Sequence, residues 1–97
     1  MKIIWSPTSQ ARARDILDYI SDDNPEAALL LIDEFEEKVE SLKQNPNAGR
    51  IIRGLKNPNI RELIVHKYYG IIYEIKSDSI YILTIRHFRR DFDETNF

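Results

Sequence analysis

Five consecutive residues near the end of the chain, Arg86-His87-Phe88-Arg89-Arg90, have the side chains best suited to chemistry. Guanidinium groups bind phosphate and carboxylate through paired hydrogen bonds, and a histidine exchanges protons near neutral pH. The adjacent arginines favour a neutral His87, which could then accept a proton. This basic run could therefore clamp a phosphate during catalysis or bind an acidic partner. The simpler alternative is a solvated strand end whose Phe88 packs into the core.

Charge is divided unevenly along the chain, although the net charge is only -2. Residues 10–45 carry ten acidic and four basic side chains, whereas residues 50–90 carry nine basic and three acidic ones. The second segment therefore predicts a basic surface. An antiparallel sheet would bring four more cations near the basic run: Arg50, Arg53, Arg61 and Lys67. Three acids follow the run at once and could neutralise it in the free protein: Asp91, Asp93 and Glu94.

The composition limits the chemistry that the chain can perform. It has no cysteine, which excludes disulfides, thiolate nucleophiles and cysteine-bound metal centres. The two histidines have no carboxylates at metal-binding spacing, so we expect no metal site and no cofactor, and a structural role for His66. No run reaches the roughly 18 apolar residues of a membrane helix, and the N-terminus lacks the apolar stretch of a secretory signal. These features predict one cytoplasmic domain spanning residues 1–97.

Caps and apolar periodicity indicate the first elements that must position the basic run. Residues 2–5 are rich in strand formers and end at Ser6-Pro7, a pair typical of a helix start. Apolar side chains at helical spacing continue to Ile20, and Asn24-Pro25 begins a second, longer helix that ends near Asn45. The short link between the helices predicts that they fold back as an antiparallel pair.

The second half of the chain predicts a sheet. Residues 50–59 have lost helical periodicity and are expected to form a basic surface loop. Strands are then expected at about 60–66, 69–76 and 80–87, and the short reversals between them make an antiparallel meander. Gly70, inside a strand, marks either a bulge or the close approach of another group.

Strict alternation along the strands assigns apolar residues to both faces of this sheet. It places Leu63 and Val65 opposite Ile60 and Ile64, and Ile80 and Ile82 opposite Leu83 and Ile85. A sheet that is apolar on both sides needs cover on both sides. We expect the helical pair to cover one face, and the tail or another protein to cover the other.

The order of these elements and four short fragments resemble the RelE/ParE superfamily of bacterial toxins from toxin-antitoxin modules. The fragments are Pro46-Asn47-Ala48-Gly49-Arg50, Ile60-Arg61-Glu62-Leu63, Tyr69-Gly70-Ile71-Ile72-Tyr73 and Ile85-Arg86-His87-Phe88-Arg89-Arg90. In order and spacing they cover nearly the whole chain. The resemblance implies an α+β fold, β-α-α-β-β-β, in which an N-terminal strand and an antiparallel helical hairpin precede a three-stranded antiparallel meander.

The superfamily includes two kinds of activity. RelE-type ribosome-dependent ribonucleases use basic residues on the sheet, an arginine after the last strand, and often a tail tyrosine or histidine. This chain has Arg61 and Arg90 at two of those positions, but Leu63 and Gly70 stand where further basic residues are expected, and the tail has no tyrosine. Losing two cations weakens a reaction step that depends on electrostatic stabilisation. The ParE branch, regarded as a non-enzymatic poison of DNA gyrase, is similar in its longer hairpin and in the Pro-x-x-Gly-Arg, Arg-Glu-Leu and His-x-Arg-Arg fragments.

The resemblance therefore favours a ParE-like toxin that poisons DNA gyrase and is neutralised by a protein antitoxin. Its target-binding residues would be Arg61, Arg86, His87, Arg89 and Arg90, in contact with gyrase or its DNA. One alternative is an endonuclease that cuts mRNA on the ribosome, with His87, Arg61 and Arg90 as catalytic residues. Another is a non-toxic remnant that only binds the antitoxin. An amphipathic antitoxin segment is expected to cover the sheet and its basic edge.

Overall fold

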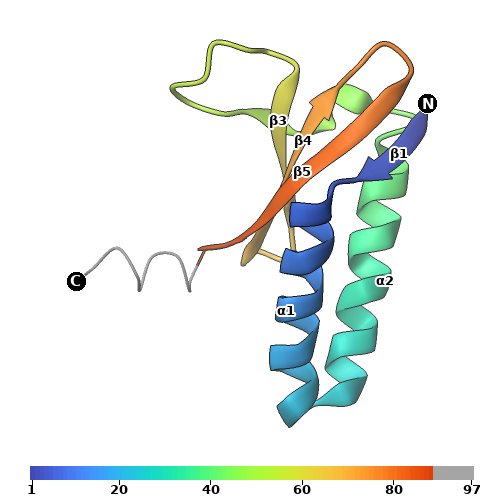
Figure 1. Ribbon diagram of the computed structural model, residues 1–97, viewed down its shortest axis with the longest axis vertical. Coiled ribbons are helices and arrows are strands. Elements are labelled where there is room, and N and C mark those ends of the chain that lie inside the picture. Colours follow the sequence, from blue (N-terminus) through green and yellow to red (C-terminus); the bar gives the residue numbers. More distant parts are fainter. Residues whose placement is uncertain (89–97) are drawn as a thin grey trace.

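Two helices lie side by side against one face of a five-stranded sheet in the computed structural model, which describes residues 1–88 (Figure 1). Arg89, Arg90 and the remaining tail lie outside the described residues. In chain order the elements are β1 (Lys2–Trp5), α1 (Pro7–Asp23), α2 (Pro25–Ser41), the 3-10 turn η1 (Pro46–Ala48), β2 (Arg50–Ile51), β3 (Ile60–Val65), β4 (Tyr69–Ile75) and β5 (Ser79–His87). The α+β architecture expected from the sequence is confirmed.

Both helices begin at the caps that the sequence indicates. The Ser6 hydroxyl accepts a hydrogen bond from the Ser9 N–H at 3.0 Å, and Pro7 is the first helical residue of α1. The Asn24 side chain accepts from the Ala27 N–H at 3.1 Å, and Pro25 begins α2. These caps satisfy backbone donors that an α-helix leaves unpaired at its start. The single residue between the helices forces the antiparallel hairpin seen in Figure 1.

The sheet has the order β1-β5-β4-β3-β2. Strands β3, β4 and β5 form the expected antiparallel meander, whereas β1 pairs with β5 in parallel. The expectation that residues 50–59 form only a loop is wrong at its start, because Arg50 and Ile51 pair with Glu62 and Arg61 as strand β2. Two residues are too short for an alternating pattern, so their pairing is visible only in the folded chain.

A β-bulge between β4 and β5 changes which side chains enter the core. Ile72 pairs with Thr84, but the next residue, Tyr73, pairs with Ile82, so one residue of β5 is skipped. The expectation that Ile85 lies opposite Ile80 and Ile82 is therefore wrong, since all three are fully buried in one core cluster. An extra residue in one strand shifts the alternation beyond it. For β3 the expected alternation is confirmed, with Val65 fully buried in the core and Ile64 exposed.

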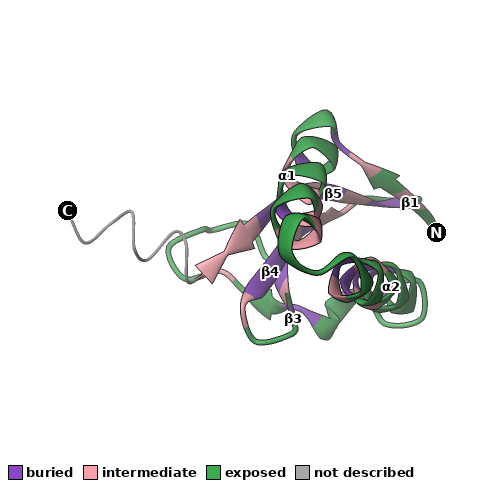
Figure 2. Ribbon diagram, turned by 90° about the horizontal axis from the view of Figure 1, so that it is seen from below, coloured by how far each residue is buried: buried purple, intermediate pink, exposed green. Residues whose placement is uncertain are grey.

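The core lies between the helical pair and the sheet, and it includes Leu31, Phe35 and Val39 of α2 (Figure 2). We call the opposite side of the sheet, which the helices do not cover, the outer face. Within residues 1–88, no helix is both long and apolar enough to span a membrane. Among residues 1–88, the outer face is the side of the sheet that no helix covers (Figure 2).

Candidate functional site on the outer face

The outer face contains a buried carboxylate between two arginines. The Glu62 side chain is only 2% exposed. Its Oε1 accepts hydrogen bonds from Nη2 of Arg50 at 2.8 Å and from Nε of Arg50 at 3.2 Å, and its Oε2 accepts one from Nη1 of Arg86 at 3.4 Å. Arg50 lies on β2 and Arg86 on β5, so the carboxylate joins two strands that are not neighbours. A buried charge needs such partners, because desolvation of a lone carboxylate is very unfavourable.

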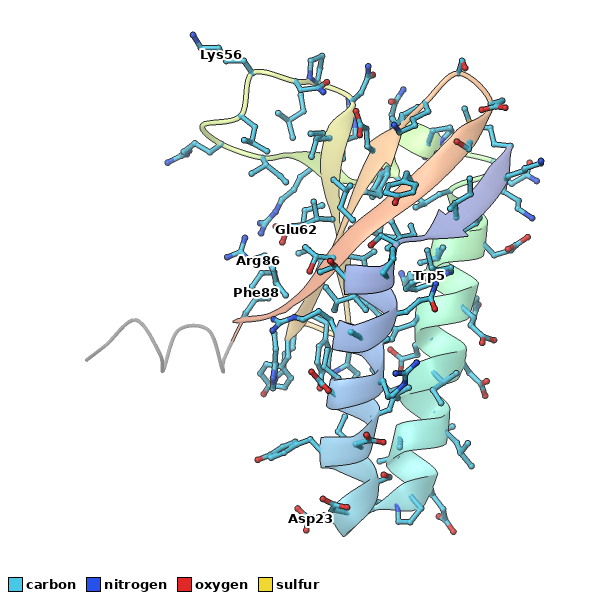
Figure 3. The ribbon with its side chains drawn as sticks, viewed as in Figure 1. Trp5, Asp23, Lys56, Glu62, Arg86 and Phe88 are labelled. Atoms are coloured by element: carbon cyan, nitrogen blue, oxygen red, sulfur yellow. The ribbon has the colours of Figure 1, made fainter. Side chains whose placement is uncertain are left out.

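Gly70 makes room for this arrangement in the middle of the sheet. It pairs with Arg86 on one side and Ile64 on the other. A Cβ atom at this position would overlap the Glu62 carboxylate and would lie 2.8 Å from Cζ of Phe88. The sequence expectation of a close approach at Gly70 is thus confirmed. The β-bulge lies further along β4, between Ile72 and Tyr73. Figure 3 shows Glu62, Arg86 and Phe88 gathered beside strand β5.

The Phe88 ring packs against the guanidinium groups of Arg50 and Arg86. The guanidinium carbon of Arg86 lies 5.2 Å from the centroid of the Phe88 ring, and that of Arg50 lies 5.9 Å from it. The Phe88 N–H also donates to the carbonyl of Tyr68 at 2.8 Å, which fixes the backbone where β5 ends. The alternative that Phe88 packs into the core is therefore wrong. Its ring interacts with cations on the outer face.

A second cluster joins the turn after α2 to the sheet. The Tyr73 hydroxyl donates to the carbonyl of Pro46 at 2.6 Å and accepts from the N–H of Gly49 at 2.9 Å. Nη1 of Arg61 donates to the carbonyl of Gly49 at 3.0 Å. Among the described residues, Nε of Arg61 is a buried polar atom without a hydrogen-bond partner. Arg61 is thus oriented toward the turn and away from Arg86.

Two tyrosines on the inner side of β4 have perturbed acidity. Burial raises the pKa of the Tyr73 hydroxyl above 10, and the Gly49 N–H and the charge of Arg61 oppose that rise only in part. Burial also raises the pKa of Tyr69, to which the nearby Tyr19 adds. Both phenols therefore stay protonated at neutral pH, where they act as hydrogen-bonding and packing groups.

The structure separates the residues predicted to form one binding surface. Adjacent residues of a strand point to opposite faces, so Arg86 lies on the outer face while the His87 ring stacks on Tyr69, with 4.8 Å between ring centroids. Arg61 pairs with the buried Tyr73 and so shares the inner face. Arg89 and Arg90 lie outside the described residues. Of the predicted set within residues 1–88, only Arg86 is on the outer face.

Sequence reasoning missed Glu62 as a member of the site, and it expected Arg50 near the basic run without assigning it a partner. Both residues belong to fragments that support the family resemblance, Arg-Glu-Leu and Pro-x-x-Gly-Arg. The resemblance assigned neither residue a contact. A charged residue on a strand otherwise made of apolar side chains is the signal that could have singled out Glu62. The register that brings Arg50 opposite Glu62 depends on β2, which the sequence did not indicate.

The four fragments that carried the resemblance meet in this region. Pro46–Arg50 contacts Tyr73 through the turn, Arg50 and Arg86 both bind Glu62, and Arg61 binds the turn carbonyl. A pocket of about 420 Å³ opens beside them, lined by Arg50, Ile51, Ile52, Arg53, Glu62 and Arg86. Guanidinium groups at such a pocket can bind oxyanions. Within residues 1–88, no three His, Cys, Asp or Glu side chains are grouped to hold a metal ion.

The fold and this arginine-lined sheet define a toxin of the RelE/ParE superfamily. The family model for the ParE toxin of the type II toxin-antitoxin system parDE matches residues 3–92. The chain belongs to that family.

Individual relatives agree with this assignment. Toxin RelE2 of Caulobacter vibrioides is 30% identical over 89 residues, which are 92% of this chain and 97% of the relative. The structure resembles one from the chromosomal ParDE system of P. aeruginosa, with a TM-score of 0.74, 27% identity, and coverage of 90% of this chain and 95% of that one. A YoeB/ParE toxin from Agrobacterium tumefaciens has the same fold, with a TM-score of 0.64, 13% identity, and coverage of 90% and 98%.

Proposed function

We propose that residues 1–97 act as one toxin domain that inhibits growth in the cytoplasm by poisoning DNA gyrase. One observation carries the choice of a binding mechanism over a catalytic one. Gly70 stands where the resemblance expects an arginine for ribonuclease chemistry, and the Glu62 carboxylate fills the space above it. A carboxylate at that place disfavours the negative charge that develops on a phosphate during cleavage.

The positions of the proposed catalytic residues support the same choice. His87 and Arg61 belong to the inner side of the sheet, where one stacks on Tyr69 and the other binds the turn after α2. Arg90 lies outside the described residues. General acid-base catalysis requires its groups within hydrogen-bond reach of one reacting centre. His87 pairs with Tyr69 and Arg61 with Tyr73, so the two residues lie about 13 Å apart along β4 and their side chains contact different partners.

We place the gyrase contact on the outer face and the loop that extends from it. Arg53 and Lys56 are exposed on this loop together with Leu55, which is 48% exposed, and Ile51 in the preceding strand β2 is 56% exposed. Lys56 lies at the far end of the loop in Figure 3. Cations mixed with exposed apolar side chains suit a protein surface of opposite charge. Arg86 adjoins this surface, and Arg89 and Arg90 are proposed to extend it.

A cognate protein antitoxin is the second proposed partner. One of the similar structures is a YoeB-YefM complex from Staphylococcus aureus, which has a TM-score of 0.57. We propose that an acidic, amphipathic antitoxin segment covers the outer face, where Ile64 is 38% exposed beside the arginines. Ile64→Glu should then weaken binding of the antitoxin. Leu29→Glu, at a 63% exposed site on α2, is the matched control and should leave binding unchanged. If only Leu29→Glu lost binding, the antitoxin would bind the helical hairpin and not the outer face.

Induction of the toxin without its antitoxin tests the proposed function in cells. Growth should stop with filamentation and a DNA damage response. The charge-reversed variant Arg53→Glu/Lys56→Glu should grow normally, with an unchanged thermal melt because exposed substitutions usually cost within about 0.5 kcal/mol each. Full toxicity of that variant would remove the loop from the contact surface. If cells that express the original chain grow normally, the chain is not toxic, and antitoxin binding is its only remaining proposed function.

A RelE-like ribonuclease is the second candidate, favoured by the name of the Caulobacter relative, Toxin RelE2. On this reading, His87, Arg61 and Arg90 would act on mRNA in the ribosome. Induction would then stop translation at once and produce mRNA cuts related to codon position. The two candidates thus predict different first events after induction, damage to DNA or loss of mRNA.

A further inference from the structure

The Glu62 carboxylate has an unusual position among the ion pairs of the described residues. Two arginines converge on it, whereas Glu40 and Glu74 each face a single lysine at a more exposed site. One carboxylate between two guanidinium groups leaves the cluster with a net charge of about +1. The arginine side chains stay open to solvent, at 61% exposure for Arg50 and 43% for Arg86.

The contacts that Glu62 makes are those that a bound phosphate would make. Carboxylate and phosphate both present paired oxygens, and arginine binds either through the same fork of N–H groups. Here two donors of Arg50 bind one oxygen, and Arg86 binds the other. The pocket of about 420 Å³ beside them, which Arg53 also lines, has room for a phosphate group.

We propose that Arg50 and Arg86 form a phosphate-binding site, and that the Glu62 carboxylate occupies it as a built-in anion that keeps phosphate out. Repulsion between Glu62 and an entering phosphate provides the exclusion, because like charges a few ångströms apart repel strongly at a partly buried site. The inference goes beyond the proposed action on gyrase and does not depend on it. It adds that the outer face selects protein surfaces over phosphate groups of nucleic acid.

The Glu62→Gln variant, with inorganic phosphate as the probe, tests this inference. Glutamine keeps the size of the side chain and removes its charge. Binding is measured by titrating phosphate against chloride at equal ionic strength and following the arginine Nε–H signals by NMR. The variant should bind phosphate at least about tenfold more tightly than the original chain, since one opposing charge has been removed. The Arg50 and Arg86 signals should shift.

Two further variants serve as controls. Glu74→Gln removes the charge of a half-buried glutamate paired with Lys76 and should not increase phosphate affinity. Glu62→Gln/Arg86→Gln removes one side of the proposed site and should lose the gain. Equal gains in the Glu74 and Glu62 variants would show a general charge effect and would overturn the proposal.

The outcome is decisive even if Glu62→Gln is unstable. A ligand that binds only the folded state stabilises it, so phosphate should refold an unfolded Glu62→Gln variant more readily than Glu62→Gln/Arg86→Gln, which experiences the same general salt effect of phosphate. A variant that stays unfolded in phosphate, or a folded variant that binds no more tightly than the original chain, overturns the proposal. So does an original chain that already binds phosphate through Arg50 and Arg86.

Discussion

The Tyr73 hydroxyl accepts a hydrogen bond from the Gly49 N–H at 2.9 Å and so ties the turn after α2 to the middle of the sheet. The same hydroxyl donates to Pro46. Gly49 is required because a Cβ atom there would lie 2.7 Å from the Tyr73 ring. This contact places β2 beside β3, which in turn brings Arg50 to Glu62. The Pro-x-x-Gly-Arg fragment thus positions one half of the arginine pair.

Removing the Tyr73 hydroxyl should destabilise the fold measurably. Tyr73→Phe leaves the buried Gly49 N–H without its acceptor, so we expect a loss of about 1–3 kcal/mol in the free energy of unfolding by urea denaturation. Tyr81→Phe is the matched control, because Tyr81 is a half-buried strand tyrosine that contacts Lys76, and should cost within about 0.5 kcal/mol. Equal costs for both variants would contradict the role of the turn contact.

Stability should fall in alkaline solution because of the two buried phenols. Burial raises the pKa of Tyr73 and Tyr69 above the unfolded value of about 10, so the native state keeps protons that the unfolded state loses. The stabilisation that the protonated phenols provide is fully present below about pH 10. It is lost as the pH rises toward the pKa of these phenols in the folded protein. Urea unfolding between about pH 8 and 11.5 should show the decline, and Tyr69→Phe/Tyr73→Phe should reduce its slope. Stability that increases above pH 10 would contradict it.

Gly70 should tolerate no side chain while Glu62 and Phe88 remain in place. Gly70→Ala forces its Cβ against both groups, and overpacking of this kind costs about 1–3 kcal/mol. Phe88→Ala removes one of the two obstacles, so Gly70→Ala should cost at least about 0.5 kcal/mol less in that background. The double-mutant cycle is measured by thermal or urea unfolding. Additive effects would mean that Phe88 does not rest against Gly70.

The sequence predicts contacts between residues that are close together in the chain better than contacts between distant segments. Proline and cap residues act locally, so both helix starts were predicted to the residue. The meander followed from apolar alternation and short reversals. The parallel pairing of β1 with β5 could not be predicted, because it joins segments about 77 residues apart whose pairing depends on the whole fold.

The candidate site was predictable only in part, for the same reason. Alternation alone could have told that Arg86 and His87 face opposite sides. Alternation along β3 likewise places Arg61 on the face of Val65, whereas the inward turn of Ile85 depends on the bulge after Ile72. Glu62 was recognised as part of a fragment, but its two arginines come from β2 and β5. Local sequence patterns do not predict contacts between strands that are far apart in the chain.

His87→Phe should leave toxicity unchanged if the toxin acts by binding. Phenylalanine preserves the ring that stacks on Tyr69 and removes the group that could move a proton. A ribonuclease that used His87 as acid or base would lose roughly 10²- to 10⁴-fold in rate. The measurement is growth after induction at matched protein levels, with a thermal melt as the folding control. A stable variant that no longer stops growth would favour the ribonuclease.

Purified toxin mixed with DNA gyrase and plasmid DNA gives the most direct test of the binding mechanism. The toxin should trap gyrase-DNA cleavage complexes that increase with toxin concentration, disappear on addition of the antitoxin, and are unchanged by His87→Phe. The same preparations in a translating extract should leave mRNA intact. Codon-associated mRNA cuts in that extract, without any effect on gyrase, would contradict the binding mechanism and establish the toxin as a ribonuclease.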